Sequence, residues 1–209
     1  EEARSNPRQF WLHAGNVARY RALADATRQA AREAGLPPPV LILQLTHSGR
    51  YSKPHGVPRP RIAHHSAVLD PLHRLPADYP LIGDAELDRL QETYGEAARL
   101  AAEAGFDGVD VKSCHRYLVS ELLASFTREG RYGGSFENRT RFLLETLARI
   151  RRDQPGLFIT TRMNAFDAIP YPFGFGVNRD NPRIPDLTEP RELARRLAAL
   201  GVPVLNVSI

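Results

Sequence analysis

The feature that most constrains the fold of this chain is a repeated alternation between helical periodicity and short apolar runs. Four apolar runs begin near residues 40, 108, 157 and 203, and each of them follows a stretch with helical spacing of its apolar residues. A helix before every strand predicts parallel strands that are joined by right-handed crossovers. The sequence therefore predicts an α/β fold, which is either a doubly wound sheet or part of a (β/α) barrel.

The expected elements are separated by long loops. Helices are predicted over about 16–33, 84–105, 135–152 and 188–200, and strands over about 40–45, 108–112, 157–162 and 202–208. We expect a single domain over residues 1–209, with a long loop insertion at 48–80. Loops that follow strand ends carry the active site in a (β/α) barrel, so the polar residues there are the first candidates for chemistry.

Composition narrows the class of protein. The 209 residues are 42% hydrophobic and 25% charged, which is typical of a soluble domain with a core. Acidic residues are spread along the chain despite the net charge of +4, which argues against a nucleic-acid partner. No apolar run is long enough for a membrane span and no signal peptide is recognisable, so we expect a cytoplasmic protein that acts on a small molecule.

Several kinds of site are disfavoured. Cys114 is the single cysteine, which excludes a disulfide within the chain and an all-cysteine metal site. The loop histidines lack the spacing of metal ligands, and we expect no metal; they are His55, His64, His65 and His73. No Gly-x-Gly-x-x-Gly or Walker-type loop follows a strand. A homo-oligomer is left open, and the absence of an initial Met suggests a piece of a longer protein.

Polar side chains follow three of the four strands. They are Gln44 and His47, then Lys112, His115 and Tyr117, then Arg162 and Asn164. The set lacks the paired acids of glycoside hydrolysis and the Ser/His/Asp arrangement of a nucleophile elbow. It offers hydrogen-bond donors, a cation and a phenol. Such groups suit the binding of a planar ligand with polar edges, the stabilisation of negative charge on a substrate oxygen, and proton donation by Tyr117.

Two segments resemble a known family. The stretch Gln44-Leu-Thr-His-Ser-Gly-Arg-Tyr-Ser52 resembles the strand-and-loop motif of the old yellow enzyme family, most closely its 2,4-dienoyl-CoA reductase branch. Residues 104–118, followed by 131–142, are similar to the central signature of that family, and the resemblance covers about residues 38–165. It implies an FMN-dependent oxidoreductase, driven by NADH or NADPH, on an eight-stranded barrel of which this chain supplies roughly strands three to six.

The resemblance also implies roles for individual residues. Gln44 matches the glutamine that hydrogen-bonds the flavin pyrimidine edge, and Arg162 matches the arginine near flavin N1 and C2=O. Tyr117 matches the proton donor, and His115 matches the second of two residues that hold the substrate oxygen. The first of that pair is histidine in many relatives and is Lys112 here. An ammonium group could bind an oxyanion or a carboxylate, whereas neutral imidazole donates one directed hydrogen bond.

The resemblance implies reduction of an activated C=C bond, and two alternatives stay open. One is a flavin-dependent dehydrogenase or demethylase that acts on an acidic or amine substrate. The other is a barrel that binds flavin or another ligand without turnover. Lys112 has a structural alternative as the partner of Asp110 or Glu121. We expect Gly133–Arg139 to be a tight turn that leads into a helix cap, and Cys114 to be a small buried filler.

Overall fold

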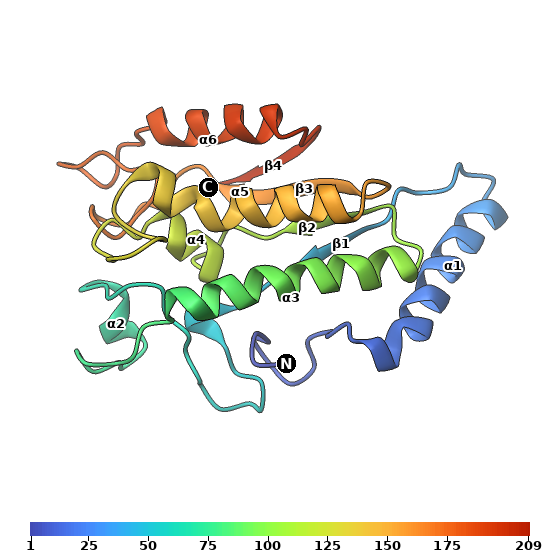
Figure 1. The fold of residues 1–209 in the computed structure, drawn as a ribbon, viewed down its shortest axis with the longest axis horizontal. Coiled ribbons are helices and arrows are strands. Elements are labelled where there is room, and N and C mark those ends of the chain that lie inside the picture. The colour runs from blue at the N-terminus through green and yellow to red at the C-terminus, as the bar shows by residue number, and fades with distance from the viewer.

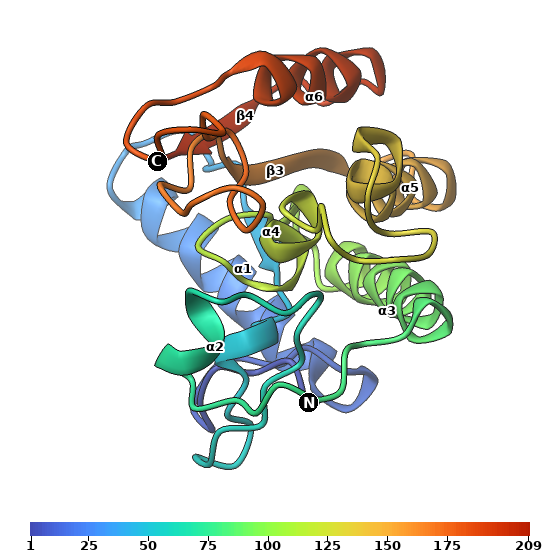
Figure 2. The ribbon, with the colours of Figure 1, turned by 90° about the vertical axis from the view of Figure 1, so that its left-hand side faces the viewer.

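A parallel four-stranded sheet forms the centre of the computed structural model, which describes residues 1–209. The strands are β1 (Ile42–Leu45), β2 (Gly108–Val111), β3 (Phe158–Asn164) and β4 (Leu205–Ser208). They lie in the order β1-β2-β3-β4, and each neighbouring pair is parallel. Strand order follows chain order without reversal, and α3, α5 and α6 lie along one side of the sheet (Figures 1 and 2). This arrangement is typical of a (β/α) barrel. In a doubly wound sheet the strand order reverses at one point, and helices cover both faces of the sheet.

Four long helices precede the four strands, as predicted. They are α1 (Val17–Glu33), α3 (Asp84–Glu103), α5 (Phe136–Asp153) and α6 (Thr188–Ala199). Their ends agree with the sequence pattern to within two residues. The last strand begins at Leu205, later than expected. Pro203 lacks the backbone N–H that a ladder hydrogen bond requires, which explains the late start.

The sequence pattern did not predict the short helices in the loops. They are the 3-10 turns at Ala14–Asn16 and Gly49–Tyr51, the four-residue α2 (Leu69–Leu72) and the six-residue α4 (Leu118–Leu123). All six residues of α4 are buried, so its sequence has no polar face that would show a helical period.

The two faces of the sheet differ in polarity. The face beneath the helices is apolar, and its side chains join one large core with those of α3, α5 and α6. On the opposite face, Gln44, Asp110 and Thr160 lie side by side in register. Lys112, directly after β2, and Arg162 on β3 each lie two residues beyond this row, and side chains alternate along extended backbone, so they share this polar face. A polar inner face is unusual for a parallel sheet and marks the place where chemistry is expected.

The segment 48–80 is largely irregular and packs onto α4 through a buried arginine. The side chain of Arg50 is fully buried. Its Nε lies 2.5 Å from Oε1 of Glu121, and its Nη1 lies 2.5 Å from Oδ1 of Asp70. Its Nη2 donates to the carbonyl of His64 at 3.1 Å. Arg50 thus fixes the course of the segment, and Glu121 is not available to Lys112.

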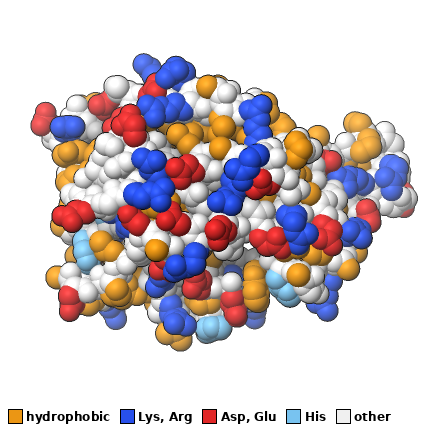
Figure 3. Space-filling view, in the orientation of Figure 1, with side chains coloured by type: hydrophobic (Ala, Val, Ile, Leu, Met, Phe, Trp, Pro, Cys, Tyr) orange, Lys and Arg blue, Asp and Glu red, His pale blue; other side chains and the backbone are white.

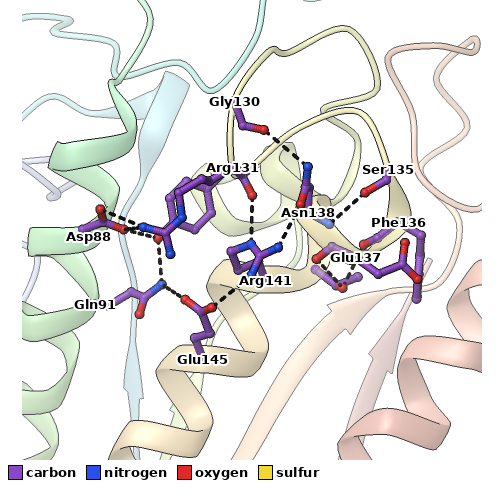
Figure 4. Close-up of polar contacts among 12 residues, drawn as sticks. Asp88, Gln91, Gly130, Arg131, Ser135, Phe136, Glu137, Asn138, Arg141 and Glu145 are labelled. Carbon is purple, nitrogen blue, oxygen red and sulfur yellow. Dashed lines mark hydrogen bonds and ion pairs between the residues drawn. The ribbon is translucent and has the colours of Figure 1, made fainter.

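The stretch from Gly133 to Arg139 is a turn and a cap. The hydroxyl of Ser135 accepts the N–H of Asn138 at the start of α5, and a Cβ at Gly133 would collide with the carbonyl of Arg128. Figure 4 shows the polar contacts around this turn, which connect α3 with α5. Arg131 reaches Asp88 at 3.2 Å, and Gln91 donates to Glu145 at 3.0 Å.

The exposed face of the helical layer carries mixed charge. Figure 3 shows basic and acidic side chains interspersed over this side of the molecule. None of the helices combines the length and the apolar character that crossing a membrane requires.

Candidate active site

The polar residues predicted from the strand ends gather on the inner face of the sheet and in the loops that follow it, at the end that faces the viewer in Figure 2. Gln44 on β1 is exposed, and its Nε2 donates to Oδ1 of Asp110 on β2 at 3.3 Å. Burial raises the pKa of Asp110, while Arg162 and Lys112 act in the opposite direction. The sequence did not single out Asp110 as a candidate site residue. The alternation of side chains along β2 nevertheless places it on the same face as Lys112.

Arg162 is a half-buried cation without a partner. Its guanidinium makes no hydrogen bond or ion pair within the chain, and its Nε is buried with no acceptor. An unpaired buried cation is costly, so the position fits a ligand that supplies acceptors or negative charge. The edge of a flavin carries such acceptors, and the exposed amide of Gln44 lies on the same face of the sheet. These two residues therefore fit the cofactor role expected of them.

Lys112 is a second cation without an ion pair. Its Nζ lies 3.7 Å from the centroid of the Tyr117 ring and makes no salt bridge to Asp110 or Glu121. Ser113 pairs with Met163 in the sheet, which places Lys112 beside Arg162 on the neighbouring strand. Burial lowers the pKa of Lys112, and the charge of Arg162 adds to this effect. The structure thus contradicts the alternative that Lys112 is a salt-bridged structural lysine.

His115 follows β2 in an uncommon backbone conformation. His115 and Arg116 both have left-handed backbone angles, with φ of 61° and 57°. The ring of His115 is exposed, whereas the adjacent Cys114 is fully buried, in agreement with its expected role as a filler. Partial burial lowers the pKa of His115, and the charges of Lys112, Arg162 and Arg116 lower it further. At neutral pH its imidazole is therefore uncharged and can donate one hydrogen bond.

Tyr117 stands immediately before α4, half-buried between two loops. Its ring packs against Tyr51 at 5.6 Å between centroids, and Tyr51 contacts His73 at 4.8 Å. Gly49 makes this approach possible, because it has a φ of +57° and a Cβ there would lie 2.6 Å from the backbone nitrogen of Leu118. Tyr51 belongs to the recognised Gly-Arg-Tyr-Ser stretch, but nothing in the sequence showed that it contacts Tyr117.

Other candidates lie outside the site. His47 is buried, and its Nδ1 accepts the N–H of Gly49, so it shapes the loop. Among the loop histidines, His65 pairs with Asp70. No group of three or more His, Cys, Asp or Glu side chains is close enough to hold a metal ion.

Known proteins resemble this chain in both sequence and structure. Residues 4–172 match the NADH:flavin oxidoreductase / NADH oxidase family. The chain is 29% identical over 153 residues to the N,N-dimethylglycine/sarcosine dehydrogenase of Chromohalobacter salexigens, which covers 69% of this chain and 21% of that protein. It is 32% identical over 169 residues to an NADPH dehydrogenase of a Geobacillus species, which covers 79% of this chain and 44% of that protein. The chain thus spans less than half the length of these relatives.

The fold is shared with a solved structure. The old yellow enzyme homologue from Zymomonas mobilis superposes with a TM-score of 0.66 at 25% identity, over 93% of this chain and 53% of that one. The expected family and the expected partial barrel are both confirmed. The chain belongs to the NADH:flavin oxidoreductase / NADH oxidase family and forms part of an FMN-type (β/α) barrel, with FMN as the family's cofactor and NADH or NADPH as its reductant.

Proposed function

We propose that this protein uses NADH or NADPH to reduce an activated C=C bond, with Tyr117 as the proton donor. The observation that carries the proposal is the set of unpartnered donors at one end of the strands. Lys112 and Arg162 lack ion pairs, His115 is exposed with its pKa lowered by partial burial and nearby cations, and Tyr117 lies against Lys112. Such a set can hold an anionic or strongly polarised oxygen and deliver a proton beside it.

Gln44 and Arg162 would hold the cofactor. The Gln44 amide can both donate and accept at the polar edge of a flavin, and the Arg162 guanidinium supplies a fixed positive charge beside it. When bound, FMN would supply the two-electron chemistry that links a nicotinamide to the substrate.

His115 and Lys112 would hold the substrate oxygen. A hydrogen bond from the imidazole and the charge of the ammonium draw electron density from the conjugated C=C bond toward that oxygen. The β-carbon then becomes the electron-poor end of the bond. Tyr117 would donate its phenolic proton to the α-carbon, and this proton together with a hydride equivalent at the β-carbon, supplied by the cofactor, would give the saturated product.

Tyr117→Phe tests the role of the phenol. We expect flavin reduction by NADPH to be unchanged and reoxidation by an enone to slow by about 10²- to 10⁴-fold, the usual contribution of a general acid. Stopped-flow absorbance separates the two half-reactions. Tyr51→Phe is the matched control, because it removes a neighbouring phenol without removing the donor, and it should leave both rates near wild type. An equal loss in both half-reactions of Tyr117→Phe would remove Tyr117 from this role.

A second candidate is oxidation of an amine that carries a carboxylate. Lys112 favours it, because an unpaired ammonium binds a carboxylate better than a neutral carbonyl. One relative is named for the oxidation of N,N-dimethylglycine and sarcosine, which are amino acids. Anaerobic mixing of the flavin-loaded protein with sarcosine distinguishes the candidates. Bleaching without a nicotinamide supports the second candidate, and no bleaching counts against it.

A further inference from the structure

The loop that carries His115 has a strained backbone and lies between β2 and α4, outside the helices and strands. Four residues other than glycine have positive φ in this chain, and they are Arg74, His115, Arg116 and Ala168. Three of the four lie in the loops that follow β2 and β3. Residues other than glycine rarely adopt this backbone conformation, and it persists where surrounding contacts enforce it.

Asn164 connects these two loops. It is the last residue of β3 and is buried. Its Oδ1 accepts the backbone N–H of His115 at 3.4 Å and the hydroxyl of Ser208 at 2.7 Å. One amide oxygen therefore links the loop after β2 with the ends of β3 and β4.

The orientation of the Asn164 amide is fixed from its other side. Its Nδ2 donates to Oδ1 of Asp167 at 2.9 Å, and Oδ2 of Asp167 accepts the N–H of Phe175 at 2.9 Å. Reversing the amide would direct an oxygen at the Asp167 carboxylate and an N–H₂ at the His115 N–H. Both contacts would be repulsive, so the acceptor must face His115.

Asn164 also lies two residues after Arg162 on the same strand. Side chains two apart on a strand point to the same face, so the cofactor candidate and the amide belong to one rigid segment. The hydrogen bond from the His115 N–H to Asn164 thus fixes the His115 loop relative to β3.

We propose that Asn164 is a positioning residue, which holds the strained His115 loop so that the imidazole stays in place to receive the substrate oxygen. This inference rests on the proposed role of His115. Without the amide oxygen, the backbone of His115 and Arg116 relaxes toward ordinary angles and the imidazole moves with it. Gln44 and Arg162 lie on strands and are not displaced.

Two measurements on the full-length, FMN-loaded protein test the proposal. The first is hydrogen exchange of the His115 amide by NMR. Although the His115 side chain is exposed, its N–H has a buried acceptor, so we expect slower exchange than for the Arg116 amide, for which no acceptor is found within the chain. Equal exchange of the two amides overturns the proposal without any substitution.

The second measurement is binding of 4-hydroxybenzaldehyde, ionised at its phenol, as an oxyanion probe followed by calorimetry. Asn164→Leu should weaken probe binding about tenfold, the factor expected for loss of one charge-assisted hydrogen bond, and leave FMN affinity within about twofold. Ser208→Ala is the matched control, because it removes the other donor to the same oxygen and leaves the His115 bond intact. It should leave probe binding near wild type.

The outcomes separate this inference from the proposed function. Unchanged probe binding in Asn164→Leu, or an equal loss in Ser208→Ala, overturns the positioning role. A parallel loss of FMN affinity also overturns it, because the effect is then a general disturbance of β3. If the wild-type protein itself fails to bind the probe, the proposed role of His115 fails, while the exchange measurement still decides whether Asn164 holds the loop.

Discussion

Lys112 is the residue that sets this site apart from the pattern it resembles. Its ammonium lies over the ring of Tyr117 and has no ion-pair partner, while Asp110 is engaged by Gln44. A half-buried cation without a partner retains a strong preference for an anion. This property bears on the choice of substrate more than on the chemistry of reduction.

Replacement of Lys112 by Met should therefore discriminate between substrates. We expect KM for a substrate with a carboxylate to rise about 10- to 100-fold, as for truncation of one partner of a desolvated charge pair, and KM for a neutral enone to change less. Steady-state kinetics with both substrates measures the difference. Lys53→Met is the control, because Lys53 is the other lysine of the chain and is exposed. Equal changes for both substrates would show that Lys112 does not recognise charge.

Two buried histidines make stability depend on pH. Burial lowers the pKa of His47 and of His64 from the ordinary 6.5 to about 4. Between these values the unfolded chain binds a proton at each histidine and the folded chain does not. The contribution of the two histidines to the free energy of unfolding is therefore fully present above pH 6.5. It is lost as the pH decreases toward about 4, by about 3 kcal/mol for each group.

His47→Asn should remove about half of this dependence, because His64 still titrates. The asparagine oxygen can still accept the N–H of Gly49, but the side chain does not titrate. Urea unfolding of wild type and variant across this pH range measures the difference in slope. Parallel curves would mean that His47 is protonated in the folded protein as readily as in the unfolded one.

At the scale of elements, the contact between the loop after β1 and the start of α4 places Tyr51 beside Tyr117. Leu118 donates its N–H to the carbonyl of His47 at 3.2 Å, directly beneath Gly49. Two features require glycine at position 49, which are its positive φ and the close approach of the backbone of Leu118.

A pair of glycine substitutions separates these two requirements. Gly35→Ala introduces strain at a φ of +69° with no atom within 4 Å of the new Cβ, and it should cost about 1 kcal/mol. Gly49→Ala adds a collision with Leu118 and should cost about 3 kcal/mol. Denaturant unfolding gives both values. Equal costs would show that the contact with α4 yields easily.

The regular elements follow from the sequence because each helix buries one stripe of side chains. The stripe on α3 includes Leu87, Tyr94 and Ala98, and its spacing predicts the helix directly. The completely buried α4 has no such stripe, and α2 is a single turn. Local pattern therefore located the scaffold and missed the short helices of the loops.

The site was predictable in part, for a different reason. Residues at strand ends converge because parallel strands end on one side, so Lys112 and Arg162 could be placed together from the sequence. The contact of Tyr51 with Tyr117 and the link from Asn164 to His115 join loops, whose paths depend on buried contacts such as those of Arg50. Sequence spacing carries no information on such paths.

At the scale of the whole molecule, the sheet has two edges that carry exposed apolar side chains. Val204 and Val207 near β4 are 58% and 53% exposed, and Ile42 on β1 is 41% exposed. In a closed barrel further strands pair with both edges. The inner face with Gln44, Lys112 and Arg162 would then line the interior of the barrel, and cofactor binding is best measured on the full-length protein.

The most direct test is the visible absorbance spectrum of the full-length protein, purified without added cofactor and then mixed anaerobically with NADH or NADPH. We predict an oxidised flavin band that bleaches with one of the two nicotinamides and returns when an enone is added. Arg162→Met should weaken FMN retention, because it removes the inner-face cation that is expected to lie beside the flavin. A colourless protein that also fails to take up added FMN would contradict the account and leave Gln44 and Arg162 without a cofactor role.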